Sequence, residues 1–262
     1  MKEELIVVKI GGNVIDDAAA MDRFLSDFSQ IKHKKILVHG GGKIATKIGT
    51  KLGLQAIMVD GRRVTDKPTL DLVTMVYGGL INKNIVAKLQ ALNSNAIGLS
   101  GADGNCILCN KRPVKEVDYG FVGDVENVDE TVLGHFIAGG FIPVMAPLSH
   151  DGKGNMLNIN ADTVATTLAK AMAKIYKVSL LYCFELKGVL SDFEDKNSVI
   201  TKMDFQHYQQ LKNQGVISKG MVPKLDNSFD AIENGVEKVV ICHSEDVLKA
   251  AQNSELGTVL SK

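Results

Sequence analysis

Two glycine-rich turns, each directly after a short apolar run, constrain this 262-residue chain more than any other feature. The first run, residues 5–10, leads into Gly11-Gly12, and the second, residues 36–39, leads into Gly40-Gly41-Gly42. Each turn precedes a segment with helical spacing. A strand, a glycine turn and a helix bring backbone N–H groups and the positive end of a helix dipole together, which favours a bound phosphate. Two such turns indicate two pieces of backbone that converge on one phosphoryl group.

Charge and hydropathy exclude several classes of protein. The 30 Lys and Arg residues balance the 30 Asp and Glu residues, so the formal net charge is zero. This balance gives no electrostatic basis for binding nucleic acid or an anionic membrane, and we expect neither as a partner. No apolar run reaches the roughly 18 to 20 residues that span a bilayer, and the first residues lack a signal-peptide pattern. We therefore expect a cytoplasmic protein.

Apolar runs alternate with amphipathic segments along the whole chain. The alternation predicts an α/β fold with a largely parallel sheet and helices on both faces, because the strands are apolar on both sides. Glycine and proline between short β-prone pieces predict two hairpins, at 104–125 and 149–157. The predicted strands are 4–10, 35–39, 55–59, 95–99, 141–146, 175–182 and 237–242, and the predicted helices are 16–32, 42–53, 67–93, 128–139, 160–174, 204–214 and 221–235.

The four cysteines carry no metal-site pattern. Cys106 and Cys109 form a C-x-x-C, but they lie in a predicted strand, where positions i and i+3 face opposite ways. Cys183 and Cys242 are isolated, so no second pair completes a zinc site. We expect all four to pack in the interior and no metal to be bound by them.

Five charged or amide-bearing residues, in three parts of the chain, are candidates for phosphate chemistry. Lys9 ends the first strand beside the glycine turn, at the carboxyl end of a strand where α/β folds bind ligands. Lys224 lies in the predicted helix 221–235, where a surface position is an equal alternative. Asn158, Asn160 and Asp162 precede a helix, and N-capping explains only one of the three.

Two further positions have alternative interpretations. Arg62 and Arg63 follow Gly61, either as a solvated pair or with a guanidinium that clamps a substrate carboxylate. His39, beside the second glycine turn, is either a base or a packed histidine, and packing is favoured.

A dinucleotide fingerprint is a rival interpretation of the second glycine turn. Gly40, Gly42 and Ala45 fit G-x-G-x-x-G/A, and Asp60 follows about 20 residues later, where an acid would bind ribose. An NAD-dependent oxidoreductase is therefore an alternative, although it leaves Lys9 and the first glycine turn unexplained. No G-x-x-x-x-G-K-[ST] loop occurs in the chain.

Seven short motifs occur together, in one order, over nearly the whole chain. In this order they resemble the amino acid kinase family, in particular its members that phosphorylate N-acetyl-L-glutamate in arginine biosynthesis. The resemblance implies a three-layer αβα sandwich with one largely parallel central sheet. It also implies an N-terminal lobe (1–175) for the acyl amino acid and dimerisation, and a C-terminal lobe (176–262) for ATP. The motifs are V-K-I-G-G (8–12), H-G-G-G (39–42), G-R-R-V-T (61–65), G-L-S-G (98–101), G-F-V-G (120–123), N-I-N-A-D (158–162) and K-G-M-V-P-K (219–224).

The resemblance also implies roles for single residues. Lys9 and Lys224 would neutralise the transferring and leaving phosphates, and Asp162 would hold both lysines. Gly12 and Gly41 would donate backbone N–H groups to the phosphoryl oxygens, and the substrate-binding set would be Gly41, Gly42, Arg63 and Asn158. ATP with Mg²⁺ would be the donor. A carboxylate nucleophile needs no general base, so catalysis would be mostly alignment and charge stabilisation.

Three departures from the family pattern limit what the resemblance implies. Residues 181–190 are longer than the usual L-T-D-x-x-G-V-L turn and lack its aspartate, and Ala102 stands where many relatives have lysine. No helical extension precedes the first strand, so we expect a homodimer without strong inhibition by arginine. The acyl group stays open between acetyl and succinyl. A kinase of a carrier-linked aminoadipate, the oxidoreductase and a non-catalytic ligand sensor remain as more distant alternatives.

Overall fold

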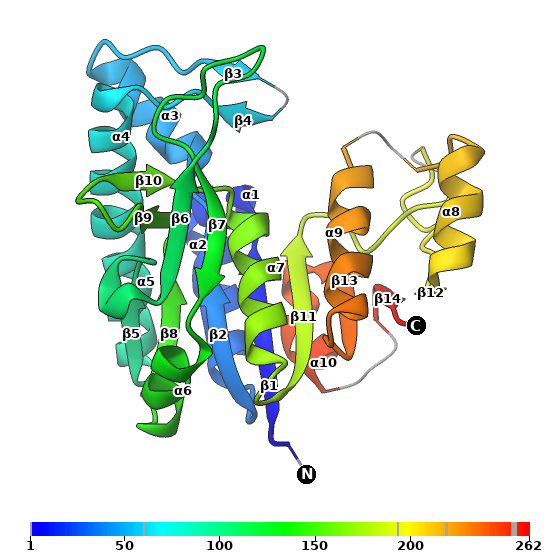
Figure 1. Cartoon of the computed structure of the whole chain (residues 1–262). Helices are drawn as coiled ribbons and strands as arrows, with labels where there is room; N and C mark the ends of the chain where they lie inside the picture. The colour runs from blue at the N-terminus through cyan, green and yellow to red at the C-terminus, as the bar shows by residue number, and fades with distance from the viewer. Residues whose placement is uncertain (1, 60, 193, 218–219, 253–255) are drawn as a thin grey trace. The chain divides into compact units, whose positions relative to one another are not determined.

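The computed structural model describes residues 2–59, 61–192, 194–217, 220–252 and 256–262. Asp60 of the dinucleotide alternative and Lys219 of the last motif lie outside the described residues. The chain forms two compact units (Figure 1). The first comprises Met1–Ile36 and Ala165–Lys262, and the second comprises Leu37–Val164.

The first unit contains a sheet whose central strands are parallel. Three neighbouring strands, β1 (Glu4–Ile10), β11 (Lys177–Phe184) and β13 (Lys238–His243), run in the same direction. Strand β14 (Thr258–Leu260) pairs antiparallel to β13, and β12 (Lys202–Met203) pairs parallel to β14. Fourteen of the 21 residues of the three central strands are apolar and buried, as expected when both faces are covered.

Helices cover this sheet on both sides. Helices α9 (Val222–Glu233) and α10 (Val247–Ala251) both contact β13, and Figure 1 shows α9 in front of it and α10 behind. Helix α2 (Ala18–Ser29) packs on α10, and α8 (Phe205–Asn213) packs on α9.

The predicted helix 16–32 is confirmed as α2, and a separate short helix that was not predicted, α1 (Gly12–Asp16), precedes it. Asp17 between them has extended backbone angles, and its carboxylate caps α2 by accepting a hydrogen bond from the backbone N–H of Ala20 at 2.9 Å. Helix α1 therefore begins at the first glycine turn itself.

The second unit contains a group of parallel strands, a four-stranded sheet and a short hairpin. Strand β2 (Lys34–Val38) crosses the boundary between the units, and its last two residues run parallel to β8 (Ile142–Met145), which pairs in parallel with β5 (Ala96–Leu99) on its other side. The four-stranded sheet has the order β10-β9-β6-β7. It contains both predicted hairpins: β6 (Ile107–Lys111) with β7 (Gly123–Val128), and β9 (Leu148–His150) with β10 (Met156–Asn158). The predicted strand 55–59 is reduced to β3 (Met58–Val59), which pairs with β4 (Arg62–Arg63).

One long helical run dominates the second unit. It consists of α4 (Lys67–Val73), the π-helix η1 (Thr74–Ile81) and α5 (Asn82–Ala91), with helical backbone angles at both junctions. This confirms the predicted helix 67–93 and adds the π segment. Helices α3 (Gly42–Lys51) and α6 (Glu130–Ala138) complete the unit.

The predicted α/β class with a largely parallel sheet and helices around it is confirmed. Helix α7 (Ala161–Met172) begins in the second unit and continues into the first. In the described part of the chain, no helix is long and apolar enough to cross a membrane. The predicted lobes, 1–175 and 176–262, are defined by the ligand that each would bind, and this division stays a prediction.

Candidate active site

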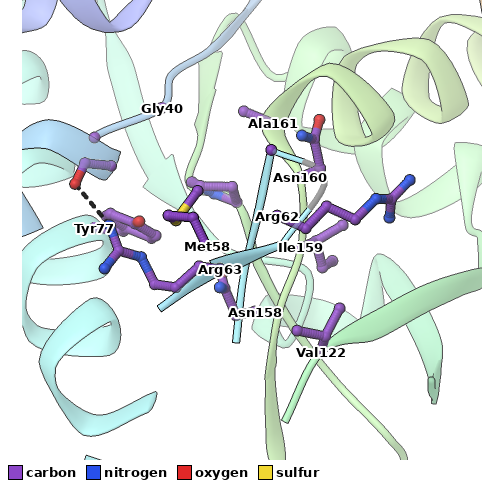
Figure 2. Close-up of a pocket in the computed structure, with 14 residues that line it drawn as sticks. Gly40, Met58, Arg62, Arg63, Tyr77, Val122, Asn158, Ile159, Asn160 and Ala161 are labelled. Atoms are coloured by element: carbon purple, nitrogen blue, oxygen red, sulfur yellow. Dashed lines mark hydrogen bonds between the residues drawn. The ribbon is translucent and has the colours of Figure 1, made fainter. Parts of the chain in front are cut away.

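A cavity of about 170 Å³ lies within the second unit, at the amino end of α3 (Figure 2). Its wall combines the second glycine turn with the β3–β4 hairpin, the helical run and the segment that joins β10 to α7. All four residues of the predicted substrate-binding set line it: Gly41, Gly42, Arg63 and Asn158. The remaining wall is formed by Gly40, Met58, Gly61, Arg62, Tyr77, Val122, Pro147, Ile159, Asn160 and Ala161.

Arg63 is fixed against the first turn of α3. Its side chain is only 8% exposed, and its Nη2 donates to the Gly42 carbonyl oxygen at 2.9 Å and to Thr46 Oγ1 at 2.8 Å. Figure 2 shows the guanidinium directed toward the glycine turn. The solvated alternative is therefore wrong for Arg63. A planar guanidinium anchored on one side suits a carboxylate bound in the cavity.

Thr65 connects Arg63 to Asn158. Its Oγ1 donates to the Arg63 carbonyl oxygen at 3.0 Å and accepts a hydrogen bond from Asn158 Nδ2 at 3.0 Å. The Asn158 backbone N–H donates to the Phe121 carbonyl oxygen at 2.9 Å. The buried Thr65 hydroxyl thus fixes the orientation of the Asn158 amide. The threonine of G-R-R-V-T belongs to the motif, but sequence reasoning gave it no role.

Gly41 has a conformation that only glycine adopts readily. Its φ is +148°, and a Cβ built there would lie 2.3 Å from Ile81 Cδ1 and 3.0 Å from Tyr77 Cδ1. Gly41 is also the N-cap of α3, so the N–H groups of the first helical turn lie at this end of the cavity. Such an arrangement suits an anion, and anion binding at this turn stays a prediction.

His39 is a structural residue of the second unit. It is fully buried, its Nδ1 lies 2.8 Å from the Gly40 carbonyl oxygen, and its Nε2 lies 3.1 Å from Asn82 Nδ2. These partners define a neutral ring with the proton on Nδ1. Burial lowers the pKa of His39 from 6.5 to about 4, although the hydrogen bond to Gly40 acts in the opposite direction. The interpretation of His39 as a packed histidine is confirmed, and its interpretation as a catalytic base is wrong.

The buried neutral imidazole of His39 predicts a pH dependence of stability. Its pKa of about 4 in the folded state lies below the unfolded value of 6.5, so the unfolded chain binds more protons between these pH values. The free energy of unfolding should therefore fall as the pH drops from about 6.5 to 4, by at most about 1.4 kcal/mol per pH unit from this group. Urea unfolding at several pH values measures the slope. His39→Gln should make the free energy of unfolding depend less steeply on pH. The same change at the partly exposed His33 is the control and should leave the slope as in the wild type. Equal slopes in both variants would contradict the buried, neutral state of His39.

Lys9 and Lys224 lie around one tyrosine of the first unit. Lys9 of β1 is directly opposite Tyr182 of β11, so the two side chains share one face of the sheet. Lys224 Nζ of α9 lies 5.9 Å from the ring centroid of Tyr182 and 5.9 Å from that of Phe184. The Tyr182 hydroxyl is hydrogen-bonded to Thr166 Oγ1 of α7 at 2.7 Å. Tyr182, near the carboxyl end of β11, is thus a common neighbour of the two lysines.

The first glycine turn lies beside the same strand end. The Gly11 N–H donates to the Cys183 carbonyl oxygen at 2.8 Å, which attaches the turn to β11. Gly12 is the first residue of α1, and no atom lies within 4 Å of a Cβ built on it. The side of Gly12 where a side chain would be is therefore open space.

Asp162 is the second residue of α7, in the second unit. Asn160 caps this helix, because its Oδ1 accepts hydrogen bonds from the N–H groups of Asp162 at 2.8 Å and Thr163 at 3.2 Å. Capping therefore accounts for Asn160 only. Asn158 lines the cavity, and the role of Asp162 stays a prediction.

The four cysteines pack in the interior as predicted. Burial raises the pKa of Cys106 to about 12 and that of Cys109 to about 11, so both stay protonated thiols at neutral pH. Among the residues that the structure describes, no group of three His, Cys, Asp or Glu side chains is arranged to hold a metal ion.

Comparisons with known proteins agree on one family. Residues 4–243 match the model of the "Amino acid kinase family". The chain is 58% identical to an acetylglutamate kinase of Cytophaga hutchinsonii over 98% of both chains, and 55% identical to an acetylglutamate kinase of Bacteroides fragilis over 100% of this chain and 98% of that one. Among solved structures, smu.665 from Streptococcus mutans UA159 is 28% identical with a TM-score of 0.76, and 98% of each chain is covered.

Proposed function

Because the chain belongs to the amino acid kinase family, we propose that it transfers the γ-phosphoryl group of ATP to the γ-carboxylate of N-acetyl-L-glutamate, a step of arginine biosynthesis. The observation that carries the proposal is the cavity of the second unit, which joins a buried arginine, a buried asparagine and a glycine turn. The names of the two relatives more than 50% identical over nearly the whole chain support the same substrate.

The cavity supplies the groups that an N-acyl amino acid requires. Arg63 receives the α-carboxylate in a charge-assisted hydrogen bond, since its guanidinium is already anchored through Nη2. Asn158 presents an amide that complements the acylamino group, and Thr65 holds that amide in one orientation. The substrate γ-carboxylate is then directed toward the second glycine turn, which lines the same cavity.

The transfer is a direct displacement. A γ-carboxylate oxygen forms a bond to the γ-phosphorus while the bond from that phosphorus to the β,γ-bridging oxygen breaks, and ADP leaves with the electron pair. Charge is spread over the transferring group, so Lys9 and Lys224 stabilise it with their ammonium groups. The N–H groups of Gly12 and Gly41 bind its oxygens, and Asp162 orients the two lysines. Tyr182 is a neighbour of both lysines, which supports their joint action on the transferring group.

ATP is the substrate in its Mg²⁺ complex. Mg²⁺ prefers hard oxygen ligands, so the ion would supply positive charge to the nucleotide phosphates. Lys9, Lys224 and the backbone amides contribute the protein's share of the charge stabilisation.

The oxidoreductase alternative is disfavoured by the family match over residues 4–243. The glycine turn that fitted the dinucleotide fingerprint lies in a cavity with a buried arginine, which suits an anionic substrate. A non-catalytic sensor is disfavoured because Lys9, Asp162 and Lys224 are all present in the chain.

Arg63→Lys should raise KM for N-acetylglutamate by about 10- to 100-fold and change kcat little. The lysine ammonium is a point charge and cannot form the two parallel hydrogen bonds of a planar guanidinium. Loss of one charge-assisted hydrogen bond weakens substrate binding by about 1.5–3 kcal/mol. Steady-state kinetics at saturating ATP measures the effect. Arg62→Lys is the matched control and should leave this KM nearly unchanged, whereas an unaltered KM in Arg63→Lys would remove Arg63 from substrate binding.

A second candidate substrate is N-succinyl-L-glutamate, and Arg62 favours it. Arg62 lines the same cavity, and Figure 2 shows its side chain directed away from Arg63. Within the described residues, the Arg62 guanidinium has no hydrogen-bond or ion-pair partner. An acetyl group carries no charge and would form no ion pair with Arg62. The distal carboxylate of a succinyl group would form an ion pair with the Arg62 guanidinium.

Trapping with hydroxylamine tests the proposed function and compares the two acyl groups. An acyl phosphate reacts with hydroxylamine to a hydroxamate, which is measured with ATP and acetyl-, succinyl- or unacylated glutamate. The proposal predicts hydroxamate with an acylated glutamate and little with free glutamate. A higher kcat/KM for the succinyl compound would replace the acetyl assignment, and no hydroxamate with any of them would contradict the proposed function.

The remaining features of the proposal concern assembly and location. Met75 and Leu80 of η1 are 60% and 48% exposed, and their spacing places them on one side of a π-helix. We propose that this apolar side is covered in a homodimer, which sedimentation equilibrium measures. The four free, buried cysteines fit a reducing compartment and a cytoplasmic location.

A further inference from the structure

Tyr77 is a buried aromatic residue in the cavity wall that belongs to none of the seven sequence motifs. Its side chain is 5% exposed, and it lines the cavity with Arg63 and the second glycine turn. Figure 2 shows the Tyr77 ring beside the Arg63 guanidinium. A buried tyrosine usually has a partner for its hydroxyl, and Arg63 is the charged group next to it.

The π-helix explains how Tyr77 reaches this place. Helix η1 interrupts a long α-helical run, and such wide turns are rare and occur often at functional sites. Tyr77 and Ile81 of η1 both contact Gly41, because a Cβ built on Gly41 would lie 3.0 Å from Tyr77 Cδ1 and 2.3 Å from Ile81 Cδ1. The π segment therefore packs directly on the anion-binding turn.

The Tyr77 phenol lies within the electrostatic influence of the Arg63 guanidinium. Burial raises the pKa of Tyr77, so the phenol is neutral at neutral pH. Arg63 acts in the opposite direction, because its positive charge favours the phenolate and its guanidinium is a hydrogen-bond donor beside the tyrosine oxygen. Gly42 and Thr46 of α3 anchor the Arg63 Nη2, and Tyr77 of η1 lies beside the same guanidinium.

We propose that Tyr77 is a positioning residue that holds the Arg63 guanidinium in the plane required by the α-carboxylate of the acyl amino acid, and that the π-helix presents its hydroxyl for this purpose. The inference rests on the proposed function. Tyr77 acts through Arg63, so its effect falls on substrate binding and leaves phosphoryl transfer unchanged. It also gives η1 a role in substrate selection.

Tyr77→Phe tests the proposal with little change in packing, because the ring that contacts Gly41 is retained. KM for N-acetylglutamate should rise about 5- to 10-fold, the scale of one lost hydrogen bond, while kcat and KM for ATP stay within about twofold. Tyr119→Phe is the matched control. Its ring lies 5.3 Å from the guanidinium carbon of Arg112, and neither residue lines the cavity, so KM should not change.

A double-mutant cycle with Arg63→Lys separates positioning from packing. In the Arg63→Lys background, Tyr77→Phe should change KM for N-acetylglutamate less than about twofold, because the guanidinium that Tyr77 orients is absent. An equal factor in both backgrounds, or a lowered kcat in place of a raised KM, would overturn the proposal. The wild-type hydroxamate assay is run in parallel. If it gives no product with any acylated glutamate, the proposed function and this inference both fail; if it gives product and the two effects are independent, only the role of Tyr77 fails.

Discussion

Replacing Lys224 by alanine is expected to lower kcat by about 10²- to 10³-fold, the usual scale for one preorganised group that stabilises transition-state charge. The Lys224 ammonium lies 5.9 Å from the rings of Tyr182 and Phe184. Tyr182 is the strand partner of Lys9, so loss of Lys224 leaves one of two neighbouring cations. Steady-state kinetics with both substrates measures the effect, and the loss should appear in kcat more than in KM.

The control for Lys224→Ala tests whether a displaced helix explains the loss. Lys212 of α8 pairs with Asp226 of α9, the helix that carries Lys224, at 2.8 Å. Lys212→Ala removes a charge that holds the same helix and should leave kcat nearly unchanged. A kcat close to wild type in Lys224→Ala would mean that this lysine does not stabilise the transferring phosphate.

The second large effect is expected at Gly41. Gly41→Ala should lower kcat/KM by at least about 100-fold, because a displacement of about 1 Å at a reacting centre has effects of this size. The new methyl group would lie 2.3 Å from Ile81 Cδ1 in a backbone conformation of φ +148°, so the turn must move. The strain should also lower the free energy of unfolding by roughly 1–3 kcal/mol.

Gly79→Ala is the matched control for Gly41→Ala. Gly79 lies in η1 near Tyr77 and Ile81, but no atom lies within 4 Å of a Cβ built on it. Activity and the urea midpoint should therefore stay near wild type. If Gly41→Ala also kept its kcat/KM, the second glycine turn would have no part in binding the phosphoryl group.

Much of the fold follows from local patterns in the sequence. The buried runs of β1, β11 and β13 are apolar on both faces, and this alone predicts a covered parallel sheet. The short strands β12 and β14 carry no such pattern. They depend on long-range pairing, such as that of Lys202 and Met203 of β12 with Val259 and Leu260 of β14.

The apolar run at 55–59 shows the limit of pattern reasoning. Ile57 and Met58 are 59% and 52% exposed, so apolar composition there does not report burial. Only two of these residues form a strand, because β4 offers a partner only two residues long.

The candidate site was predictable where a motif carries the chemistry. Arg63 and Gly41 follow from residue type and position, because an arginine after a turn and a glycine before a helix both suit an anion. Tyr77 and Thr65 were not predictable in this way. Tyr77 reads as one more apolar position of a long helix, since the 3.6-residue period gives no sign of a π segment.

The most direct test of phosphoryl transfer to a carboxylate follows an oxygen atom. N-acetylglutamate with ¹⁸O in both γ-carboxylate oxygens is converted with ATP, the acyl phosphate is cleaved by hydroxylamine, and the released phosphate is examined by ³¹P NMR. If the carboxylate attacks the γ-phosphorus directly, the released phosphate carries one ¹⁸O atom from the substrate. Phosphate without ¹⁸O would show that no bond forms between the carboxylate and phosphorus, and it would contradict the function proposed for Lys9, Lys224 and the two glycine turns.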